Sequence, residues 1–474
     1  MKKLLLLSIF AMSLLLATAQ DYKKVQNAFL LGRVEDAKTE IDKMATDPKA
    51  QAKAETYMWK GKIYAAIFKN QQLSAKYPTA EADAEAALAK YEEMDSTYAV
   101  AKEKDGITSY FDMYAGFISQ GSSRYNQILT RIQNDATYNE NEKLKDWANA
   151  GKSFVNGIRF IDKIIMNKWT SNSIGMDTTS ILYAAICFQN AKELENAAVY
   201  YKRIADNKVK DSNYVDVYRF LVDYYTRGKK DETQFYKYLS VAREVFPALA
   251  EEWESYEMDF IDTYDLKAKT DLYAKEEAAG TLTENKYIQY GSSFANAKMK
   301  DDLDSATAAM YNNKAVDAFK KAYAKNNKNA IAAFNSGVIY YNSFGELDDK
   351  VRENIRTVQR INAEKPVEKD PKKKAATDAK VKAETEPYLK ANAALEAPIA
   401  QQVDQAIEWL EKAYTLLKDK ATRTNNERSV INKSVDWLAN LYGYKRDKVR
   451  GKDNAAFDKY EAKFKEFDAL HSKF

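Results

Sequence analysis

Few side chains in this 474-residue sequence have a type and spacing that could do chemistry. Residues 150–153 (AGKS) match the end of a phosphate-binding loop, but position 146, where that loop needs its first glycine, holds Asp146. The only histidine, His471, lies close to the C-terminus. Metal sites and histidine-dependent nucleophiles need a firmly positioned imidazole. We therefore expect neither a nucleotide site nor histidine-dependent catalysis.

The remaining chemical candidates are acids and a single cysteine. Cys187 lies within an apolar helical run, which is typical of a buried, inert thiol. Asp301, Asp302 and Asp304 lack the loop glycine and the terminal glutamate of a calcium-binding loop. Chemistry that uses only paired carboxylates, as in glycosidases, stays open, although no pair of acids stands out. The sequence thus predicts no metal, no cofactor and a protein that is not an enzyme.

The first twenty residues, MKKLLLLSIFAMSLLLATAQ, have the three parts of a secretory signal peptide. Lys2 and Lys3 form the positive start, residues 4–16 the apolar run, and residues 17–19 (ATA) the cleavage site. We assign residues 1–19 to the signal peptide and expect a periplasmic bacterial protein, with secretion as the alternative. No cysteine follows the apolar run, so we expect no lipid anchor. No later segment is apolar enough to span a membrane.

The composition favours long helices and narrows the classes of partner. Glycine (15) and proline (7), which interrupt helices, are scarce for this length. The 33 Tyr, 20 Phe and 6 Trp can fill the seams between packed helices. The formal net charge of +4 gives no electrostatic reason to expect nucleic acid as a partner. A single cysteine excludes an internal disulfide.

Apolar residues recur at alternating spacings of four and three along most of the chain, which predicts amphipathic helices. Ala315, Phe319 and Ala322 are one example, and Ala197, Tyr201 and Ile204 are another. No region alternates apolar and polar residues for long enough to require a sheet. The predicted fold class is therefore all-α, an α-solenoid of antiparallel helical hairpins.

Two spacings indicate a repeat. Ala185 and Ala197 are 12 residues apart, Ala315 and Gly337 are 22 apart, and together these spacings make 34. A period of 34 residues is that of tetratricopeptide repeats, pairs of helices that stack into a curved superhelix. The physical basis of such a pattern is close packing, because a small residue on one helix lets its neighbour approach.

At several positions the sequence resembles the tetratricopeptide family. Gly337 and Tyr340 match its G-x2-Y element, and Ala315 and Phe319 match its A-x3-F element. The sequence departs from the family pattern in two ways: its Trp position never holds Trp, and its loop lengths vary.

We divide the chain after the signal peptide into five segments. Residues 20–100 form N-terminal tetratricopeptide-like hairpins, 101–178 an irregular helical segment, 179–345 tetratricopeptide-like repeats, 346–400 a long helix followed by a charged Lys/Pro linker inserted between repeats, and 401–474 C-terminal repeats. The linker assignment rests on three prolines, many lysines and almost no large apolar residue within 365–387.

By this resemblance, the first helix of each pair lines a concave face, and residues beside the packing positions point into it. These candidate partner-binding residues are Gln189, Asn190, Tyr225, Tyr341, Asn342, Asn440 and Tyr444. Tyrosine and amide side chains suit peptide segments because they combine rigid aromatic area with hydrogen bonding.

The leading functional hypothesis is a periplasmic scaffold that binds another envelope protein or peptide along this face, with the 346–400 insert as a second docking segment. The alternative is a glycan-binding protein that uses its helices as SusD-like glycan-binding lipoproteins do. A third reading is an enzyme that uses only carboxylates. The oligomeric state and the identity of the partner do not follow from the sequence.

Overall fold

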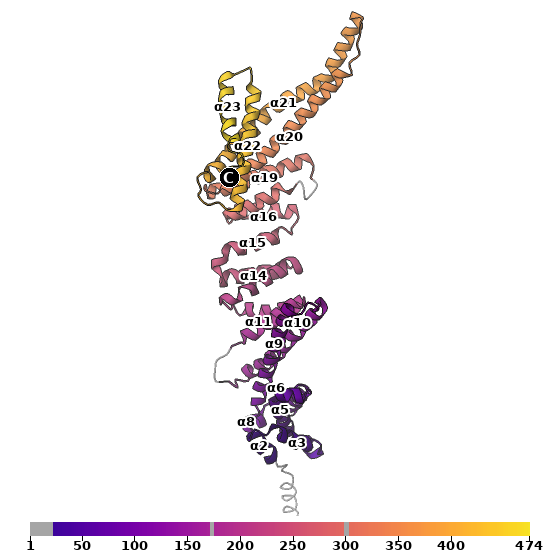
Figure 1. Cartoon of the computed structure of the whole chain (residues 1–474), viewed down its shortest axis with the longest axis vertical. Coiled ribbons are helices and arrows are strands. Elements are labelled where there is room, and N and C mark those ends of the chain that lie inside the picture. Colours follow the sequence, from indigo (N-terminus) through magenta and orange to yellow (C-terminus); the bar gives the residue numbers. More distant parts are fainter. Residues whose placement is uncertain (1–21, 171–174, 298–302) are drawn as a thin grey trace, which may run out of the picture. The chain divides into compact units, whose positions relative to one another are not determined.

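In the computed structural model the described residues are 22–170, 175–297 and 303–474. The predicted signal peptide, residues 1–19, lies outside them. The chain divides into two compact units, with unit 1 ending at Trp253 and unit 2 beginning at Glu254. Within the described ranges every regular element is a helix, and successive helices pack against one another (Figure 1). The predicted all-α, solenoid-like fold is confirmed.

Unit 1 begins with short helices and continues with longer ones. Its helices are α2 (Lys23–Leu30), α3 (Val34–Met44), α4 (Pro48–Gln51), α5 (Ala54–Lys69), α6 (Gln71–Lys76), α7 (Ala80–Met94), α8 (Ala99–Glu103), α9 (Thr108–Asn134), α10 (Glu140–Met166), α11 (Thr178–Asn190), α12 (Leu194–Asp206), η1 (Ser212–Tyr214), α13 (Val215–Asp223), the π-helical turn η2 (Tyr224–Gly228), α14 (Glu232–Val245) and η3 (Pro247–Leu249). Gly32 lies in the break between α2 and α3 with a φ of +73°, a backbone conformation that favours glycine.

Helix α15 (Ala250–Ile261) crosses the boundary between the units. Unit 2 continues with α16 (Leu266–Ala278), α17 (Glu284–Ala295), α19 (Ser305–Lys325), α20 (Ala330–Ala363), α21 (Pro371–Leu417), α22 (Asn425–Val449) and α23 (Asn454–Asp468). The main core of its C-terminal half joins α20, α21, α22 and α23.

Neighbouring helices approach closely wherever a glycine on one accepts a phenylalanine from the other. A Cβ atom added to Gly116 would lie 2.6 Å from the ring of Phe68, and one added to Gly291 would lie 2.8 Å from the ring of Phe319. Real Cβ atoms do not come this close to other carbon atoms, so these positions admit no side chain without displacing the ring. Unit 1 repeats the arrangement in two further pairs, Gly121 with Phe154 and Gly151 with Phe188.

The packing positions predicted from the 34-residue spacing lie in the core of unit 2. Ala315, Phe319 and Ala322 are at most 2% exposed. Gly337 is buried against α21, since an added Cβ atom would lie 2.8 Å from Cγ of Leu410 and 3.2 Å from its backbone nitrogen. These residues therefore set the spacing between helices, as the sequence predicts, and do not form a ligand site.

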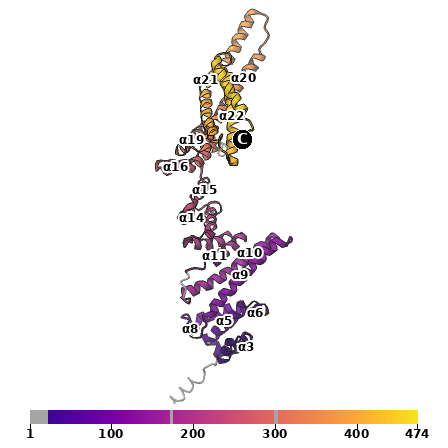
Figure 2. The ribbon, with the colours of Figure 1, turned by 60° about the vertical axis from the view of Figure 1, so that its left-hand side comes forward.

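The prediction of a charged linker within residues 346–400 is wrong for residues 371–400. These residues form the first part of α21, which pairs with α20 and extends with it away from the other helices of unit 2 (Figures 1 and 2). Three local features favour the helix. Asp370 caps its first turn, Pro371 occupies the first helical position, and the segment is rich in alanine, lysine and glutamate.

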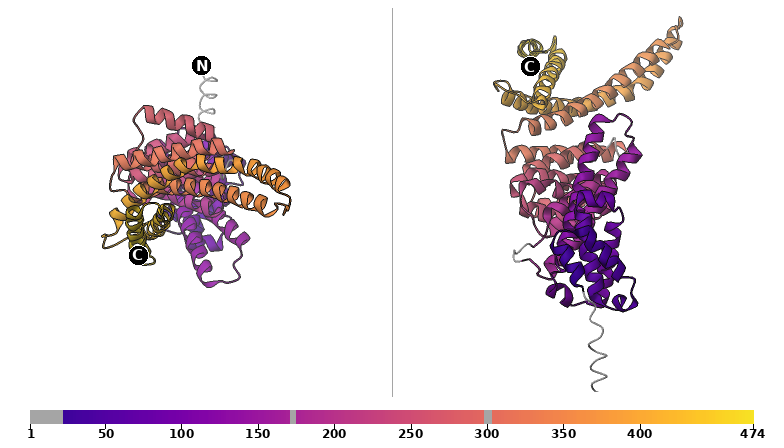
Figure 3. Two further views of the ribbon diagram at one scale, coloured as in Figure 1. Left: turned by 90° about the horizontal axis from the view of Figure 1, so that it is seen from above. Right: turned by 60° about the horizontal axis from the view of Figure 1, so that its bottom comes forward.

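We name the paired parts of α20 and α21, residues 347–363 and 371–399, the arm; Figure 3 shows it from two further sides. Each helix of the arm carries half-buried or buried residues at alternating spacings of four and three, as in a coiled-coil seam. The seam residues are Leu347, Val351, Asn354, Val358 and Ile361 on α20, and Val381, Thr385, Tyr388, Asn392, Leu395 and Ile399 on α21. Pro387 and Pro398, which interrupt the hydrogen bonding of α21, are exposed outside this seam.

A polar pair fixes the register of the arm. The side-chain amide of Asn354 donates a hydrogen bond of 2.8 Å to the carbonyl oxygen of Asn392. A shift of one helix along the other would leave both amides facing aliphatic side chains. Such a pair specifies alignment at a cost in stability, as single asparagines do in coiled coils.

We predict opposite effects for alanine at two glycines of α20. Gly337→Ala should destabilise unit 2 by roughly 1–2 kcal/mol, because the new methyl group overlaps Leu410. Gly345→Ala should stabilise it by about 0.5–1 kcal/mol, because no atom lies within 4 Å of the added Cβ and alanine is the better helix former. Hydrogen exchange of the α20 and α21 amides measures both effects. If both variants changed the stability of unit 2 in the same direction, close contact between helices at Gly337 could not be the cause.

A second prediction concerns the asparagine pair. Asn392→Leu alone should weaken the arm by about 1–3 kcal/mol, because it leaves the amide of Asn354 without its partner. Asn354→Leu combined with Asn392→Leu should recover that loss or exceed it, because both polar groups are then gone. Hydrogen exchange across residues 350–363 measures the difference. Additive effects of the two substitutions would show that the amides do not interact.

Candidate functional site

Three of the seven predicted groove residues come together in unit 2. Tyr341 lies on α20, and Asn440 and Tyr444 lie on the facing side of α22. The side-chain amide of Asn440 donates a long hydrogen bond of 3.4 Å to the hydroxyl of Tyr341. Because α20 and α22 pack against each other, residues almost 100 positions apart in the sequence share one surface.

Five aromatic side chains run along this surface, and we name them the aromatic row. They are Phe334, Tyr341 and Phe344 from α20, and Trp437 and Tyr444 from α22. Phe334 is buried, and the other four are half-buried. Phe344 meets Tyr444 edge to face, with ring centroids 4.9 Å apart, and Tyr341 lies 6.2 Å from Phe344.

Trp437 is held between two rings. Its ring is nearly parallel to Phe334 at 5.5 Å and to Tyr341 at 4.7 Å. Phe334 and Tyr341 are seven residues apart on α20, a rise of about 10.5 Å at ~1.5 Å per residue. This rise is close to the two stacking distances taken together, so the rings cover opposite faces of the indole. The sandwich fixes α22 on α20 and leaves the exposed edges of the row as its accessible surface.

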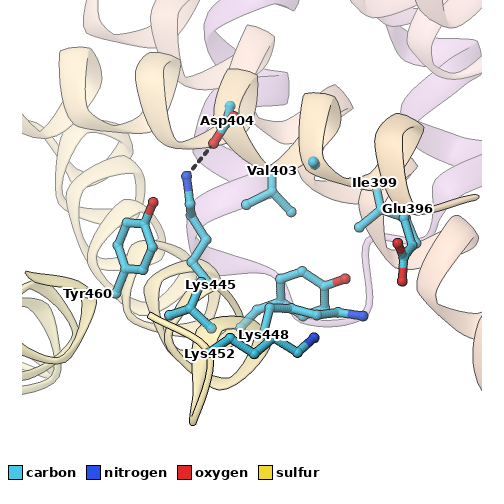
Figure 4. Close-up of a pocket in the computed structure, with 11 residues that line it drawn as sticks. Glu396, Ile399, Val403, Asp404, Lys445, Lys448, Lys452 and Tyr460 are labelled. Carbon is cyan, nitrogen blue, oxygen red and sulfur yellow. Dashed lines mark hydrogen bonds and ion pairs between the residues drawn. The ribbon is translucent and has the colours of Figure 1, made fainter. Parts of the chain in front are cut away.

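A cavity of about 280 Å³ opens beside Tyr444, at the end of the aromatic row. It lies between α21, α22 and α23, with Ile399 and Val403 as its apolar floor (Figure 4). Tyr444 and Tyr460 form parts of its wall. Tyr444 thus belongs both to the aromatic row and to the cavity, and it makes one continuous surface of them.

One ion pair crosses the cavity. Lys445 on α22 reaches Asp404 on α21 at 2.5 Å, with the ring of Tyr460 beside it (Figure 4). Burial is the largest single influence on Lys445 and by itself would lower its pKa, but the hydrogen bonds to Asp404 and Tyr460 and the negative charge of Asp404 together raise this pKa. Lys445 therefore stays cationic, and its charge is largely neutralised by Asp404.

Two further lysines line the cavity at the C-terminal end of α22. The ammonium of Lys448 lies 5.4 Å from the ring centroid of Tyr444, and Lys452 follows in the adjoining turn. Within the described residues neither lysine has a carboxylate within ion-pair distance, while Glu396 lies on the α21 side. Burial, and then the nearby carboxylates of Asp348 and Glu396, raise the pKa of Tyr444 to about 12, so its hydroxyl is neutral at physiological pH.

The other predicted groove residues lie elsewhere. Asn342 is exposed on α20, next to the aromatic row. Gln189 and Asn190 are exposed at the end of α11 in unit 1, where the Gln189 carbonyl accepts a hydrogen bond of 2.6 Å from Tyr201. A role in binding for these three residues stays a prediction.

The prediction that Tyr225 faces a groove is wrong. Tyr225 is buried, and its ring stacks on Tyr238 at 5.7 Å with the two planes 7° apart. The cause is the π-helical turn η2, whose wider spacing changes the direction of side chains relative to an α-helix. Tyr224 and Tyr225 are both buried as a result.

The residues that the sequence analysis considered for chemistry lie in the following places. Gly151 lies inside α10 against the ring of Phe188, so residues 150–153 do not form a phosphate-binding loop. Cys187 is fully buried, and burial raises its pKa to about 12. His471 is exposed and lies 2.7 Å from Asp436, which raises its pKa. Asp304 caps α19, whereas Asp301 and Asp302 lie outside the described residues.

Three residues of the aromatic row, Phe334, Phe344 and Trp437, were missed from the sequence, although a helical spacing signal was present. Trp437 precedes Asn440 by three residues and Tyr444 by seven, which places all three on one face of a helix. Phe344 follows Tyr341 by three residues in the same way. No sequence signal showed that these two faces lie against each other.

No protein-family model matches this chain, and no curated protein matches it either. Among the described helices, none has the length and apolar character needed to cross a membrane. Across residues 22–170, 175–297 and 303–474, no three His, Cys, Asp or Glu side chains are grouped so that they could hold a metal ion.

We predict that Tyr341 and its neighbour Asn342 differ sharply in their structural importance. Tyr341→Ala removes one of the two rings that hold Trp437 and should destabilise the contact between α20 and α22 by roughly 1–3 kcal/mol. Asn342→Ala, at an exposed position, should change stability by less than about 0.5 kcal/mol. Hydrogen exchange over residues 434–444 measures this difference. Equal hydrogen-exchange protection in the two variants would mean that stacking of Tyr341 on Trp437 does not stabilise the contact between α20 and α22.

Proposed function

We propose that this protein is a non-enzymatic scaffold of the bacterial cell envelope that binds a polypeptide segment of another envelope protein. The observation that carries the proposal is the aromatic row of unit 2 and its continuation into the cavity beside Tyr444. Rigid aromatic side chains with exposed edges and nearby amides are typical of protein interfaces. Exposed Asn440 and Asn342 supply the amides.

The cellular place in this proposal comes from the sequence. The positive start, the apolar run and the ATA cleavage site within residues 1–19 support export to the periplasm, with secretion as the alternative. The 34-residue spacing supports a tetratricopeptide-like arrangement of the helix pairs. Such helix stacks present extended surfaces to polypeptides, which fits a scaffold.

The geometry of the aromatic row favours a polypeptide over the alternative glycan ligand. A sugar ring stacks on an open aromatic face, but Phe334 and Tyr341 occupy both faces of Trp437. The ammonium of Lys448 also lies over the ring of Tyr444. The row therefore offers ring edges and hydroxyl groups, which suit the side chains and backbone of a peptide.

The arm is the proposed second docking segment. Its outer surface exposes two large apolar side chains, Ile355 at 44% and Leu389 at 55%, among many charged residues. We place it second because the aromatic row opens into a cavity that can anchor a bound segment.

Site-specific photocrosslinking in the native envelope tests the scaffold proposal. A benzoylphenylalanine at position 440 should crosslink one envelope protein in near-stoichiometric yield, because Asn440 lies on the aromatic row. The matched control is position 426, an exposed asparagine of the same helix, which lies 14 residues or about 21 Å away at ~1.5 Å per residue.

The control decides the outcome. Crosslinking at 440 but not at 426 supports the proposal. Equal yields at the two positions, or no crosslinked protein from correctly folded material, would refute binding at this surface. A specific hit for the purified protein on a glycan array would favour the alternative.

A further inference from the structure

The cavity beside Tyr444 allows the partner segment to be described more closely, and this inference rests on the proposed function. We infer that the cavity binds an acidic anchor of the partner polypeptide, namely one large apolar side chain with a carboxylate next to it. The apolar side chain would enter against Ile399 and Val403. Lys448 and Lys452 would hold the carboxylate.

The size of the cavity limits its occupant. At about 280 Å³ it lies just below the range of ~300–1,000 Å³ typical of sites for small molecules and cofactors. A nucleotide, an oligosaccharide or a long acyl chain would overfill it. A single phenylalanine or leucine side chain of a bound peptide is of the right order.

The inner surface of the cavity is apolar. Ile399 is 3% exposed and Val403 is 1% exposed, and both belong to the core of unit 2. The rings of Tyr444 and Tyr460 and the side chain of Val449 add further apolar area. Removal of an apolar group from water on entering this surface is favourable, whereas a charged group would lose its hydration there.

The charges around the cavity are distributed unevenly, and this selects an acid. Asp404 neutralises Lys445, which leaves Lys448 and Lys452 on the α22 side and Glu396 on the α21 side. Lys448 is held near the cavity by its contact with the ring of Tyr444. A carboxylate is therefore attracted to the α22 side, and Glu396 repels it from the α21 side. This arrangement also gives the bound segment a direction.

The cavity and the aromatic row act on one ligand, because Tyr444 belongs to both. A segment anchored in the cavity would continue past Phe344 and Asn440 along the row. The anchor supplies position and charge selection, and the row supplies contact area.

The test uses the full-length protein and three labelled peptides. The probe is fluorescein-SGDFDGS, with SGDSDGS lacking the apolar side chain and SGKFKGS reversing the charge. Fluorescence anisotropy should show the probe binding at least ten times more tightly than either matched peptide. Equal affinities of the three peptides would overturn the inference.

Two protein variants locate the binding. The double variant Lys448→Glu with Lys452→Glu should bind the probe at least ten times more weakly and should bind SGKFKGS more tightly. The control is Lys372→Glu with Lys373→Glu, which makes the same charge change at exposed positions of the arm and should alter neither affinity. Ala400→Trp, at an exposed position that lines the cavity, should block the probe by filling the space. Probe binding that survives both cavity variants would overturn the inference.

Further outcomes separate this inference from the scaffold proposal. Crosslinking at 440 without selective binding of the probe would sustain the scaffold and refute the acidic anchor. If position 440 gives no crosslink and the probe does not bind selectively, both the scaffold proposal and the acidic anchor are refuted. Displacement of the probe by decanoate at a concentration where SGDSDGS and acetate have no effect would assign the cavity to a fatty acid, and the polypeptide anchor would be wrong.

Discussion

The structure depends on close approach between helices at positions without a side chain. Where Gly291 faces Phe319, or Gly337 faces Leu410, the two helices are closer than any Cβ atom would permit. Each contact places an aromatic or leucine side chain directly on a neighbouring backbone and excludes water from the seam. Because the contact recurs along the chain, each helix is positioned by the previous one, and small local distances determine where distant surface residues lie.

The candidate site is a consequence of this packing. Contact at Gly337 fixes α20 on α21, and the Trp437 sandwich fixes α22 on α20. These two contacts bring Tyr341, Asn440 and Tyr444 onto one surface and leave the cavity between α21, α22 and α23. The residues that set the spacing are buried, while those beside them remain accessible. Structural and binding roles are therefore divided between neighbouring positions on the same helices.

The arm shows how a sequence poor in large apolar residues still folds as helix. Its seam is narrow, with side chains that are mostly half-buried, and its register depends on a hydrogen-bonded pair of asparagines. Ion pairs four residues apart, such as Lys390 with Glu386, add modest local stability on its surface. The composition of this segment, rich in lysine and containing proline, is typical of a linker. The alternating spacing of four and three between its few apolar residues instead indicates a helix that pairs with another.

The sequence by itself determined the helical class and the buried packing positions at Ala315, Phe319 and Gly337, because these follow from spacing along one helix. It also placed Tyr341, Asn440 and Tyr444 at accessible positions. Only the tertiary structure decided that these three meet, that Trp437 joins them between two rings, and that a cavity opens beside Tyr444. It also decided that Tyr225 is buried by a π-helical turn. The physical reason is that the direction of a side chain repeats within a helix and can be read locally, whereas the partner it meets depends on contacts between helices far apart in the chain.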